Sequence, residues 1–394
     1  MYLKTERNGT MVTVQEARKL TCNLISIPSI NPGGDIHGAA IFVKEWLEDI
    51  GVESKIIKVS GVPNVMATIG KKGGKRLLFN GKFDVVPPGD FSKWDTEPFF
   101  PTCKDGYIYG RGSSDMKSGL AAMMLAIKEM KKLEEKLQGE IIFMAVGDGE
   151  TGGVKGTQTL LETLGSNYDG AIVPEPTDFC VESAQRGLRW VEIRIKGRAS
   201  HAARPHLGRN AIEQASKIIA ALKSMTFDVE NNIFEEALRR PSISVNKIHG
   251  GIQNNIIAED CKMLVDRRML PGETEEKVMK EIEQTVNSVL DEGFRAEFEV
   301  VSKGWDPYML NQDEPILNTV VKAYEKITGE KPVIRGKGGC TDASHIFKAG
   351  IPVVILGPGS PDESHTTNEK VSIERIALTA DILVDAALNF LSYR

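Results

Sequence analysis

The chain has 394 residues, of which 41% are hydrophobic and 26% charged, and its formal net charge is −5. A chain of this length exceeds one ordinary hydrophobic core, so two domains are expected. The acidic balance, without a basic cluster, argues against a nucleic-acid partner. No apolar run is long enough to cross a bilayer, so no membrane partner is expected. The polar segment 1–10 lacks the apolar core of a signal peptide, and we expect a cytoplasmic protein.

The five cysteines are scattered along the chain, are odd in number and form no Cys-x-x-Cys pair. They are Cys22, Cys103, Cys180, Cys261 and Cys340. This pattern predicts reduced cysteines that lie mostly in the core. It favours neither a disulfide framework nor a zinc knuckle.

Helical and strand-like segments alternate in the first part of the chain. Apolar spacing predicts helices over 14–26, 39–50, 118–133 and 158–164, and strands over 54–57, 65–69, 77–79, 140–146 and 170–173. Strands that alternate with helices in this way predict a doubly wound, mainly parallel sheet in an α/β fold.

The pattern changes near Arg186. The next segments are predicted as a strand over 189–195, a helix over 211–222, strands over 242–248 and 261–266, a helix over 274–289 and a strand over 296–301. This β-α-β-β-α-β order is that of a ferredoxin-like unit. The α/β pattern then resumes with helices over 316–327, from 342 and over 373–391, and strands at 333 and 353–356. We therefore expect an α/β domain of residues 1–180 and 303–394, with residues 181–302 as an inserted domain.

One stretch, 77–87, places two ionisable side chains at the end of a predicted buried strand. Gly81 and Pro87 mark the point where the apolar run 77–79 opens into a loop. Residues two apart in an extended chain share a face, so Lys82 and Asp84 are expected to point the same way. Strand ends are the usual place for chemistry in an α/β sheet. An ordinary salt-bridged loop explains this stretch equally well when it is taken alone.

Further carboxylates and one histidine end predicted strands or lie in loops bounded by glycine and proline. The set comprises Asp84, Asp115, Asp148, Glu150, Glu175 and His365. Carboxylates with imidazole suit zinc, cobalt or manganese. Any one of these residues is more commonly a helix cap or a surface acid. Because most of them follow predicted strands, a shared metal site is favoured.

Several separate motifs resemble the M20 metallopeptidase/amidohydrolase family, the group of acetylornithine deacetylase, succinyl-diaminopimelate desuccinylase and carboxypeptidase G2. The likeness covers nearly the whole chain and rests on Gly110-Arg-Gly-Ser-Ser-Asp-Met-Lys, Pro174-Glu-Pro-Thr and Gly197-Arg-Ala-Ser-His-Ala-Ala-Arg-Pro-His. The resemblance implies a catalytic α/β domain and an inserted lid through which the chain forms a homodimer. It also implies zinc or cobalt as the cofactor.

The resemblance assigns roles to individual residues. Asp115 would bridge two metal ions, Glu175 would bind the first, and Glu150 and His365 would bind the second. His201 would be the polarising histidine of the lid, which in the family reaches the site of a neighbouring subunit. Asn255 and Arg268 would hold the substrate. Asp84 would correspond to the residue that, in the family, orients the histidine ligand of the first metal without binding the metal itself.

Two positions depart from the family pattern. Lys82 stands where the family has a histidine that binds the first metal, and Gly149 stands where it has the general base, a glutamate. A lysine ammonium has no lone pair and cannot bind a metal. We expect Lys82 to lie close to Asp115 and Glu175, to pair with Asp84, and to supply positive charge in place of the first metal.

The ligands of the second metal survive, so one ion per chain is expected. Asp115, Glu150 and His365 would leave a fourth position open, as a catalytic zinc requires. Asp148 is a poor replacement base, because a strand neighbour of Gly149 points to the other face.

Three interpretations of function follow. In the first, the chain is a metal-dependent amidohydrolase that cleaves the amide bond of an N-acyl amino acid or small peptide, with activity altered by Lys82 and Gly149. In the second, it is a catalytically inactive relative that binds such ligands. In the third, it is a purely structural dimer partner, which the intact His201, Asn255, Arg268 and His365 disfavour.

Overall fold

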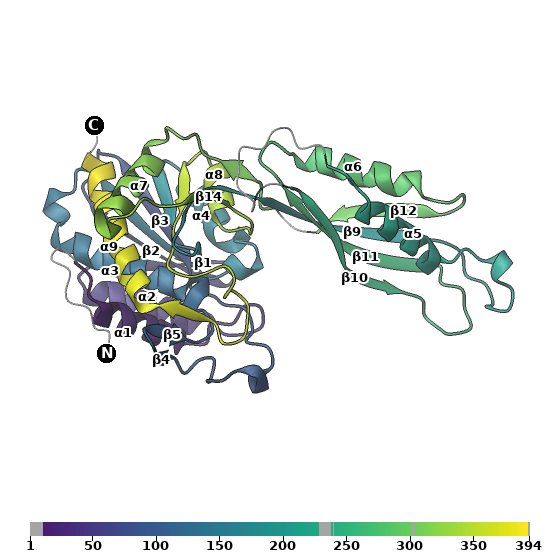
Figure 1. Cartoon of the computed structure of the whole chain (residues 1–394), viewed down its shortest axis with the longest axis horizontal. Helices are drawn as coiled ribbons and strands as arrows, with labels where there is room; N and C mark the ends of the chain where they lie inside the picture. Colours follow the sequence, from purple (N-terminus) through teal and green to yellow (C-terminus); the bar gives the residue numbers. More distant parts are fainter. Residues whose placement is uncertain (1–10, 228–237, 239, 302–303, 393–394) are drawn as a thin grey trace. The chain divides into compact units, whose positions relative to one another are not determined.

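The computed structural model describes residues 11–227, 238, 240–301 and 304–392 (Figure 1). The chain forms two compact units. The α/β unit consists of Met1–Ala184, Leu310–Arg335 and Thr341–Arg394, and the inserted unit consists of Gln185–Met309 and Gly336–Cys340. One continuous segment of the inserted unit therefore interrupts the α/β unit, and a short second segment joins it.

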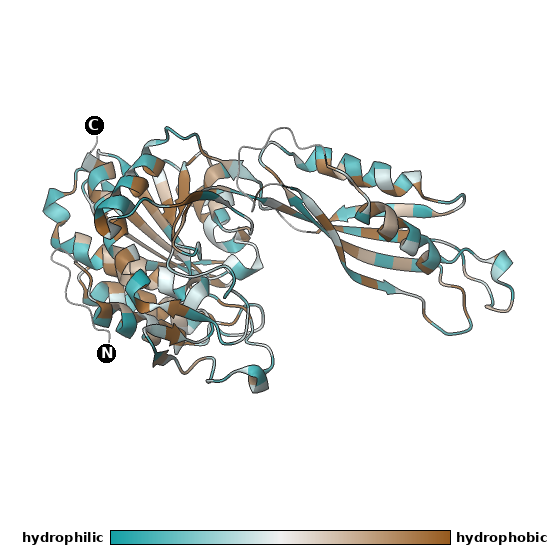
Figure 2. Ribbon diagram, viewed as in Figure 1, coloured by the Kyte–Doolittle hydropathy of each residue, from teal (hydrophilic) through white to brown (hydrophobic). Residues whose placement is uncertain are grey.

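The α/β unit is organised around a sheet in which β3 (Arg76–Lys82) is central. β3 runs parallel to both of its neighbours, β6 (Glu140–Val146) and β7 (Gly170–Val173). β15 (Val353–Ile355) continues the parallel set beside β7. These strands are buried along almost their whole length, which is typical of a parallel sheet covered on both faces. Figure 2 shows them among the most hydrophobic segments of the chain.

On one side of the parallel set β2 pairs antiparallel with β6 and β1 with β2, and on the other side β8 pairs antiparallel with β15. The strand order is β1-β2-β6-β3-β7-β15-β8-β13, and β14 also pairs with β8. The outer strands are β1 (Ser54–Val59), β2 (Val62–Gly70), β8 (Val181–Gln185), β13 (Tyr308–Met309) and β14 (Ile334–Lys337). The prediction of a mainly parallel α/β sheet is confirmed for the central strands.

Helices pack around this sheet, and the last of them contacts three others. α9 (Ile373–Ser392) contacts α1 (Val14–Ile25), α3 (Ser118–Lys132) and α7 (Pro315–Thr328). The remaining helices of the unit are α2 (His37–Asp49), α4 (Thr159–Leu164) and α8 (Ala343–Lys348). None of the helices that the structure describes is both long and apolar enough to cross a membrane.

A small second sheet in the α/β unit was not predicted. Its strands are β16 (Lys370–Ser372), β5 (Tyr107–Tyr109) and β4 (Thr102–Lys104), in that order. Each strand has three residues, which is too short to show a period-two pattern. β5 leads directly into Gly110 and so into the loop that carries Asp115.

The inserted unit has the predicted β-α-β-β-α-β order. Its elements are β9 (Gly187–Lys196), α5 (Ala211–Lys223), β10 (Ser242–Gly250), β11 (Asp260–Met269), α6 (Glu275–Ser288) and β12 (Arg295–Val300). They form an antiparallel sheet with strand order β10-β11-β9-β12. Alternate residues of β9 (Val191, Ile193 and Ile195) are buried against apolar residues of both helices, so one face of the sheet carries the core.

The prediction that the cysteines lie mostly in the core is wrong. Cys261 is buried, Cys22, Cys180 and Cys340 are partly exposed, and Cys103 is exposed. All five are free thiols. The scattered spacing gave no information about burial, which depends on the face that each short element turns inward.

Gly119 lets the start of α3 approach the backbone of Pro174 closely, next to the candidate site. It is the second residue of α3, and a Cβ there would clash with the carbonyl oxygen of Pro174, the residue before Glu175. We predict that Gly119→Ala lowers the free energy of unfolding by about 1–3 kcal/mol, measured by urea denaturation, because backbone must move.

Gly38 provides the matched control for that variant. It is the second residue of α2, and a Cβ there would meet only Ile27 Cγ2, at an ordinary 3.5 Å. Gly38→Ala should change the free energy of unfolding by no more than about 0.5 kcal/mol. Equal effects of the two substitutions would show that the approach of α3 to Pro174 is not tight.

Candidate metal and catalytic site

Lys82 is the last residue of β3, and its side chain is buried between two carboxylates. The ammonium Nζ donates to Asp115 Oδ1 at 2.6 Å and to Glu150 Oε1 at 2.5 Å. Burial opposes the charged form, but Asp115 and Glu150 raise the pKa of Lys82 well above its usual value. These carboxylates therefore favour the charged form of Lys82 at the end of the central strand.

The structure adds Glu150 to the predicted neighbours of Lys82. Asp115 contacts it as expected, but its second ion pair is with Glu150, which was assigned to the second metal alone. Glu175 is buried and acts on Lys82 through its charge, which also raises the pKa of the lysine. The difference arises because Glu150 lies in the turn that follows β6, the strand adjacent to β3.

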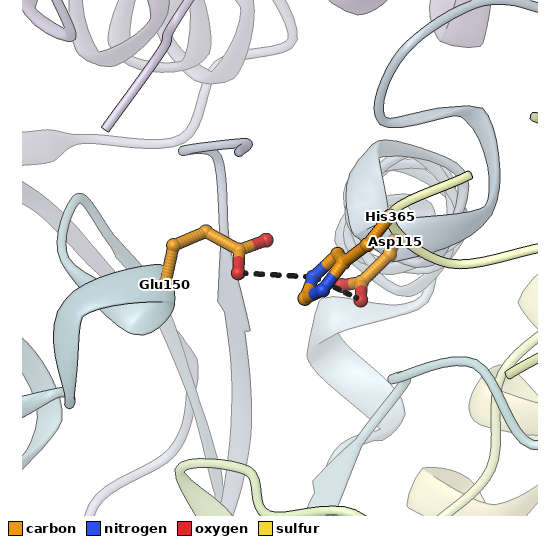
Figure 3. Close-up of side chains that lie close together, drawn as sticks. All are labelled: Asp115, Glu150 and His365. Atoms are coloured by element: carbon orange, nitrogen blue, oxygen red, sulfur yellow. Dashed lines mark ion pairs between the residues drawn. The ribbon is translucent and has the colours of Figure 1, made fainter. Parts of the chain in front are cut away.

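Asp115, Glu150 and His365 come together as a possible ligand set (Figure 3). One ligand atom from each lies within 4.8 Å of the others. His365 Nε2 is 3.4 Å from Asp115 Oδ2 and 3.3 Å from Glu150 Oε2. Each carboxylate thus turns one oxygen to Lys82 and the other to His365. Two carboxylates and an imidazole form a donor set that zinc and cobalt accept, so the residues fit a metal ion.

The charges of this cluster balance one another. Hydrogen bonds to Asp115 and Glu150 raise the pKa of His365 to about 10. Burial opposes ionisation of Asp115, but Lys82 and His365 hold its pKa well below the usual range. Because a metal binds the neutral imidazole, an ion at this position would replace the proton of His365.

Glu369 holds the loop of Asp115 in place and was not assigned a role from the sequence. This buried carboxylate accepts the backbone N–H groups of Gly112 at 3.0 Å, Ser114 at 2.7 Å and Asp115 at 2.9 Å. It also pairs with Arg111 Nη1 at 2.6 Å. The only sequence signal was its place in Asn368-Glu369, shortly after His365. Glu369 therefore holds the backbone of the loop that carries the candidate ligand Asp115.

Lys117 ties the other end of the same loop to α1. Its buried Nζ donates to Leu24 O at 2.9 Å and to Ile27 O at 2.6 Å. Burial lowers the pKa of this lysine to about 7. Two carbonyls, one in the last turn of α1 and one just beyond the helix, thus hold the segment two residues beyond Asp115.

Asp84 holds the loop that carries Glu150. It accepts the N–H groups of Gly149 and Glu150, both at 3.1 Å, and Asn31 Nδ2 at 2.9 Å. Burial raises its pKa to about 7. The expected direct pairing with Lys82 is wrong for the described residues, because β3 ends at Lys82 and the alternation does not continue to Asp84. The charge of Asp84 still contributes to the raised pKa of Lys82.

Gly149 and Lys82 fit each other sterically. A Cβ at position 149 would overlap Lys82 Cδ and would lie 3.0 Å from its Cβ and 3.1 Å from its Cγ. Gly149 does not have a left-handed backbone, so the glycine is required for space and not for conformation. The stem of Lys82 thus fills the volume in which a side chain at position 149 would begin.

Asp148 is engaged elsewhere. Its Oδ2 accepts the backbone N–H of Lys155 at 2.6 Å, and burial together with the charge of Asp342 raises its pKa to about 7. Among the described residues Asp148 forms no hydrogen bond or ion pair with Lys82, in agreement with the expectation that it points away from the site.

The three remaining candidate residues belong to the inserted unit. The segments of His201 and Asn255 lie side by side, since Ala202 N donates to Asn255 O at 2.9 Å and His201 bridges to Ile256. Arg268 lies in β11, where its Nε donates to Asp266 Oδ1 at 2.9 Å. The structure brings His201 and Asn255 together within this unit and places Arg268 on its sheet.

Comparison with known proteins shows the family. The chain matches Peptidase family M20/M25/M40 over residues 78–389, and it belongs to this family of metallopeptidases and deacylases. Among its relatives, succinyl-diaminopimelate desuccinylase from Bordetella avium is 30% identical over 366 residues, which are 90% of this chain and 93% of the relative.

Solved structures confirm the fold class. An M20 family metallo-carboxypeptidase from Sulfolobus solfataricus has a TM-score of 0.80 at 21% identity, covering 96% of this chain and 100% of that one. A dinuclear metal-binding peptidase of the M20 family from Bacillus subtilis has a TM-score of 0.72 at 17% identity, covering 96% and 98%. At these identities the likeness establishes the α/β unit with a separate antiparallel unit.

The steric fit of Lys82 and Gly149 predicts strong coupling between the two positions. Gly149→Ala should lower the free energy of unfolding by about 1–3 kcal/mol, since the new methyl group displaces the lysine stem. In a Lys82→Ala background the same change should cost much less, giving a coupling energy of about 0.5–3 kcal/mol in urea denaturation.

Lys82→Met distinguishes the steric effect of the side-chain stem from the effect of the ammonium charge. Methionine keeps a stem but not the ammonium, so Gly149→Ala should remain costly in that background. An equal effect of Gly149→Ala in all three backgrounds would contradict the steric interpretation.

Proposed function

We propose that the chain is an amidohydrolase that cleaves the amide bond of an N-acyl amino acid or small peptide at a site for one divalent metal ion. The observation that carries the proposal is the convergence of Asp115, Glu150 and His365 on one point, with Lys82 joining the two carboxylates from the other side. The desuccinylase named above supports the class of substrate.

Asp115, Glu150 and His365 would hold zinc or cobalt, which when bound acts as a Lewis acid on the carbonyl of the scissile amide. Lys82 neutralises the carboxylate oxygens that face away from His365. Asp84 and Glu369 hold the backbone of the two ligand loops. The residues of the chain thus orient the ligand set before any substrate arrives.

The proposed activity lacks a general base at position 149. Removal of a positioned base lowers the rate by about 10²–10⁴, and the replacement of one metal by Lys82 removes part of a two-metal clamp. We therefore infer slow or altered hydrolysis. His201, Asn255 and Arg268 are proposed to contact the acyl amino acid from the inserted unit, with His201 acting as the polarising histidine.

The second candidate is a catalytically inactive relative that binds the same ligands, and the same two residues favour it. Binding without turnover would appear as a rise in melting temperature with an N-acyl amino acid but no release of the free amino acid. Turnover supports the enzyme. The absence of both effects would favour a purely structural dimer partner.

We predict about one tightly held metal ion per chain or fewer. Lys82 supplies the positive charge that Asp115 would otherwise require from a second ion, so elemental analysis after loading with zinc and mild dialysis should find a single site. His365→Ala should lose this ion while keeping the fold. Two tightly held ions per chain would overturn the prediction.

Restoring the two departed residues should increase hydrolysis. The double substitution Lys82→His and Gly149→Glu should give at least about 10²-fold faster release of amino acid from N-acetyl or N-succinyl amino acids with zinc or cobalt. Each single change should do much less, because a glutamate at 149 clashes with the Lys82 stem and a histidine at 82 has no base beside it. Groups that act as a unit are non-additive in this way.

Two results would count against that expectation. If the double variant folds, binds two ions and hydrolyses none of these compounds, the site has diverged at other positions or the substrate class is wrong. If the unaltered chain already matches the double variant, the interpretation of Lys82 and Gly149 is wrong.

We also predict a homodimer through the inserted unit. β10 is an edge strand of its sheet, and Ile248 on β10 and Ile212 on α5 expose 44% and 43% of their surface. Light scattering at micromolar concentration should give the dimer mass, because paired edges and apolar side chains are removed from water. Ile248→Lys should weaken the dimer, while Ile41→Lys on α2, which is similarly exposed, should not. A monomer at that concentration would refute the prediction.

A further inference from the structure

Two free thiols of the α/β unit face each other outside the candidate metal site. The sulfur atoms of Cys22 in α1 and Cys103 in β4 are 3.6 Å apart, although the residues are 81 positions apart in sequence. We propose that this pair is a modification site, at which a small-molecule disulfide oxidises the two thiols to a reversible disulfide bond within the chain.

The geometry requires only a small movement. A disulfide bond is about 2.05 Å long, so the sulfurs must approach by about 1.5 Å. β4 is the edge strand of the small sheet, and Cys103 is exposed on it. An exposed residue on a three-residue edge strand can make this approach while Cys22 keeps its place in α1.

The surroundings assign different roles to the two thiols. Burial, together with the neighbouring Cys103, raises the pKa of Cys22 to about 12. Cys22 thus stays protonated while Cys103 faces solvent, where a small disulfide can reach it. Arg18 lies one helical turn before Cys22 and favours negative charge on its sulfur when that proton leaves.

The exchange proceeds in two balanced steps. The Cys103 thiolate attacks one sulfur of the small disulfide, forms a mixed disulfide and releases one small thiolate. The Cys22 sulfur then attacks the Cys103 sulfur, the protein S–S bond forms, and the second small thiolate leaves. The two small thiolates take up the proton of Cys22 and the proton that Cys103 gave to solvent when it became a thiolate. Two protein thiols are thereby oxidised to one disulfide, while the small disulfide is reduced to two thiols.

The bond would join elements on both sides of the loop that carries Asp115. Leu24 at the end of α1 and Ile27 just after it accept hydrogen bonds through their carbonyls from Lys117 at the end of that loop. β4 pairs with β5, which runs into Gly110 at its beginning. Closing such a long loop restricts the unfolded chain, so the oxidised protein should melt at a higher temperature.

The test is incubation of the full chain with oxidised glutathione, followed by intact mass and peptide mapping after blocking of free thiols. We expect a product that has lost two hydrogen atoms per chain, a peptide that links Cys22 to Cys103, and a raised melting temperature that dithiothreitol reverses. Cys180→Ser, which removes another partly exposed thiol, should leave all three results unchanged.

The single variants examine the order of the steps. Cys22→Ser should stop the reaction at a glutathione adduct on Cys103, and Cys103→Ser should prevent the linked peptide and leave Cys22 without an adduct. An adduct that persists on Cys103 in the unaltered chain, a link to another cysteine, or a link between two copies would overturn the proposal. The same holds if no linked peptide forms in oxidised glutathione while the chain remains folded.

Discussion

The buried ammonium of Lys82 is the interaction on which the geometry of the candidate site depends. Asp115 and Glu150 come from different loops, and two carboxylates this close would repel each other if both were left without a cation. Lys82 lies on the central strand and attracts one oxygen of each. The remaining oxygens then face His365, so one cation on the sheet organises ligands from three separate segments.

The fold provides the conditions for this arrangement. β3 lies between β6 and β7, so the loops after these strands bring Glu150 and Glu175 to the end of β3. The approach of α3 to Pro174 at Gly119 leads Asp115 to the same place. Two buried carboxylates then hold the loops: Asp84 accepts the backbone N–H of Glu150, and Glu369 accepts that of Asp115. Parallel topology and a few backbone hydrogen bonds are therefore sufficient to position the set.

Much of this fold could be predicted from apolar periodicity, because β3, β6 and the helices are long enough to show it. The strands β4, β5 and β16 could not, since three residues carry no period. Motif resemblance nominated the candidate ligands, of which Asp115, Glu150 and His365 lie together. It did not find the partners that depend on distant contacts, namely Glu369 for Asp115, or Asp84 for the backbone of Gly149 and Glu150.

The sequence presents Lys82 and Gly149 as two separate departures from the family pattern, 67 positions apart by their numbering. In the folded chain they are one steric unit, because the lysine stem needs the space that any side chain at 149 would fill. With glycine there, a lysine fits and satisfies Asp115 and Glu150; with a glutamate there, it would be displaced. The Lys82 stem and any side chain at position 149 are thus alternative occupants of one small volume, so the residue at either position restricts the residue at the other.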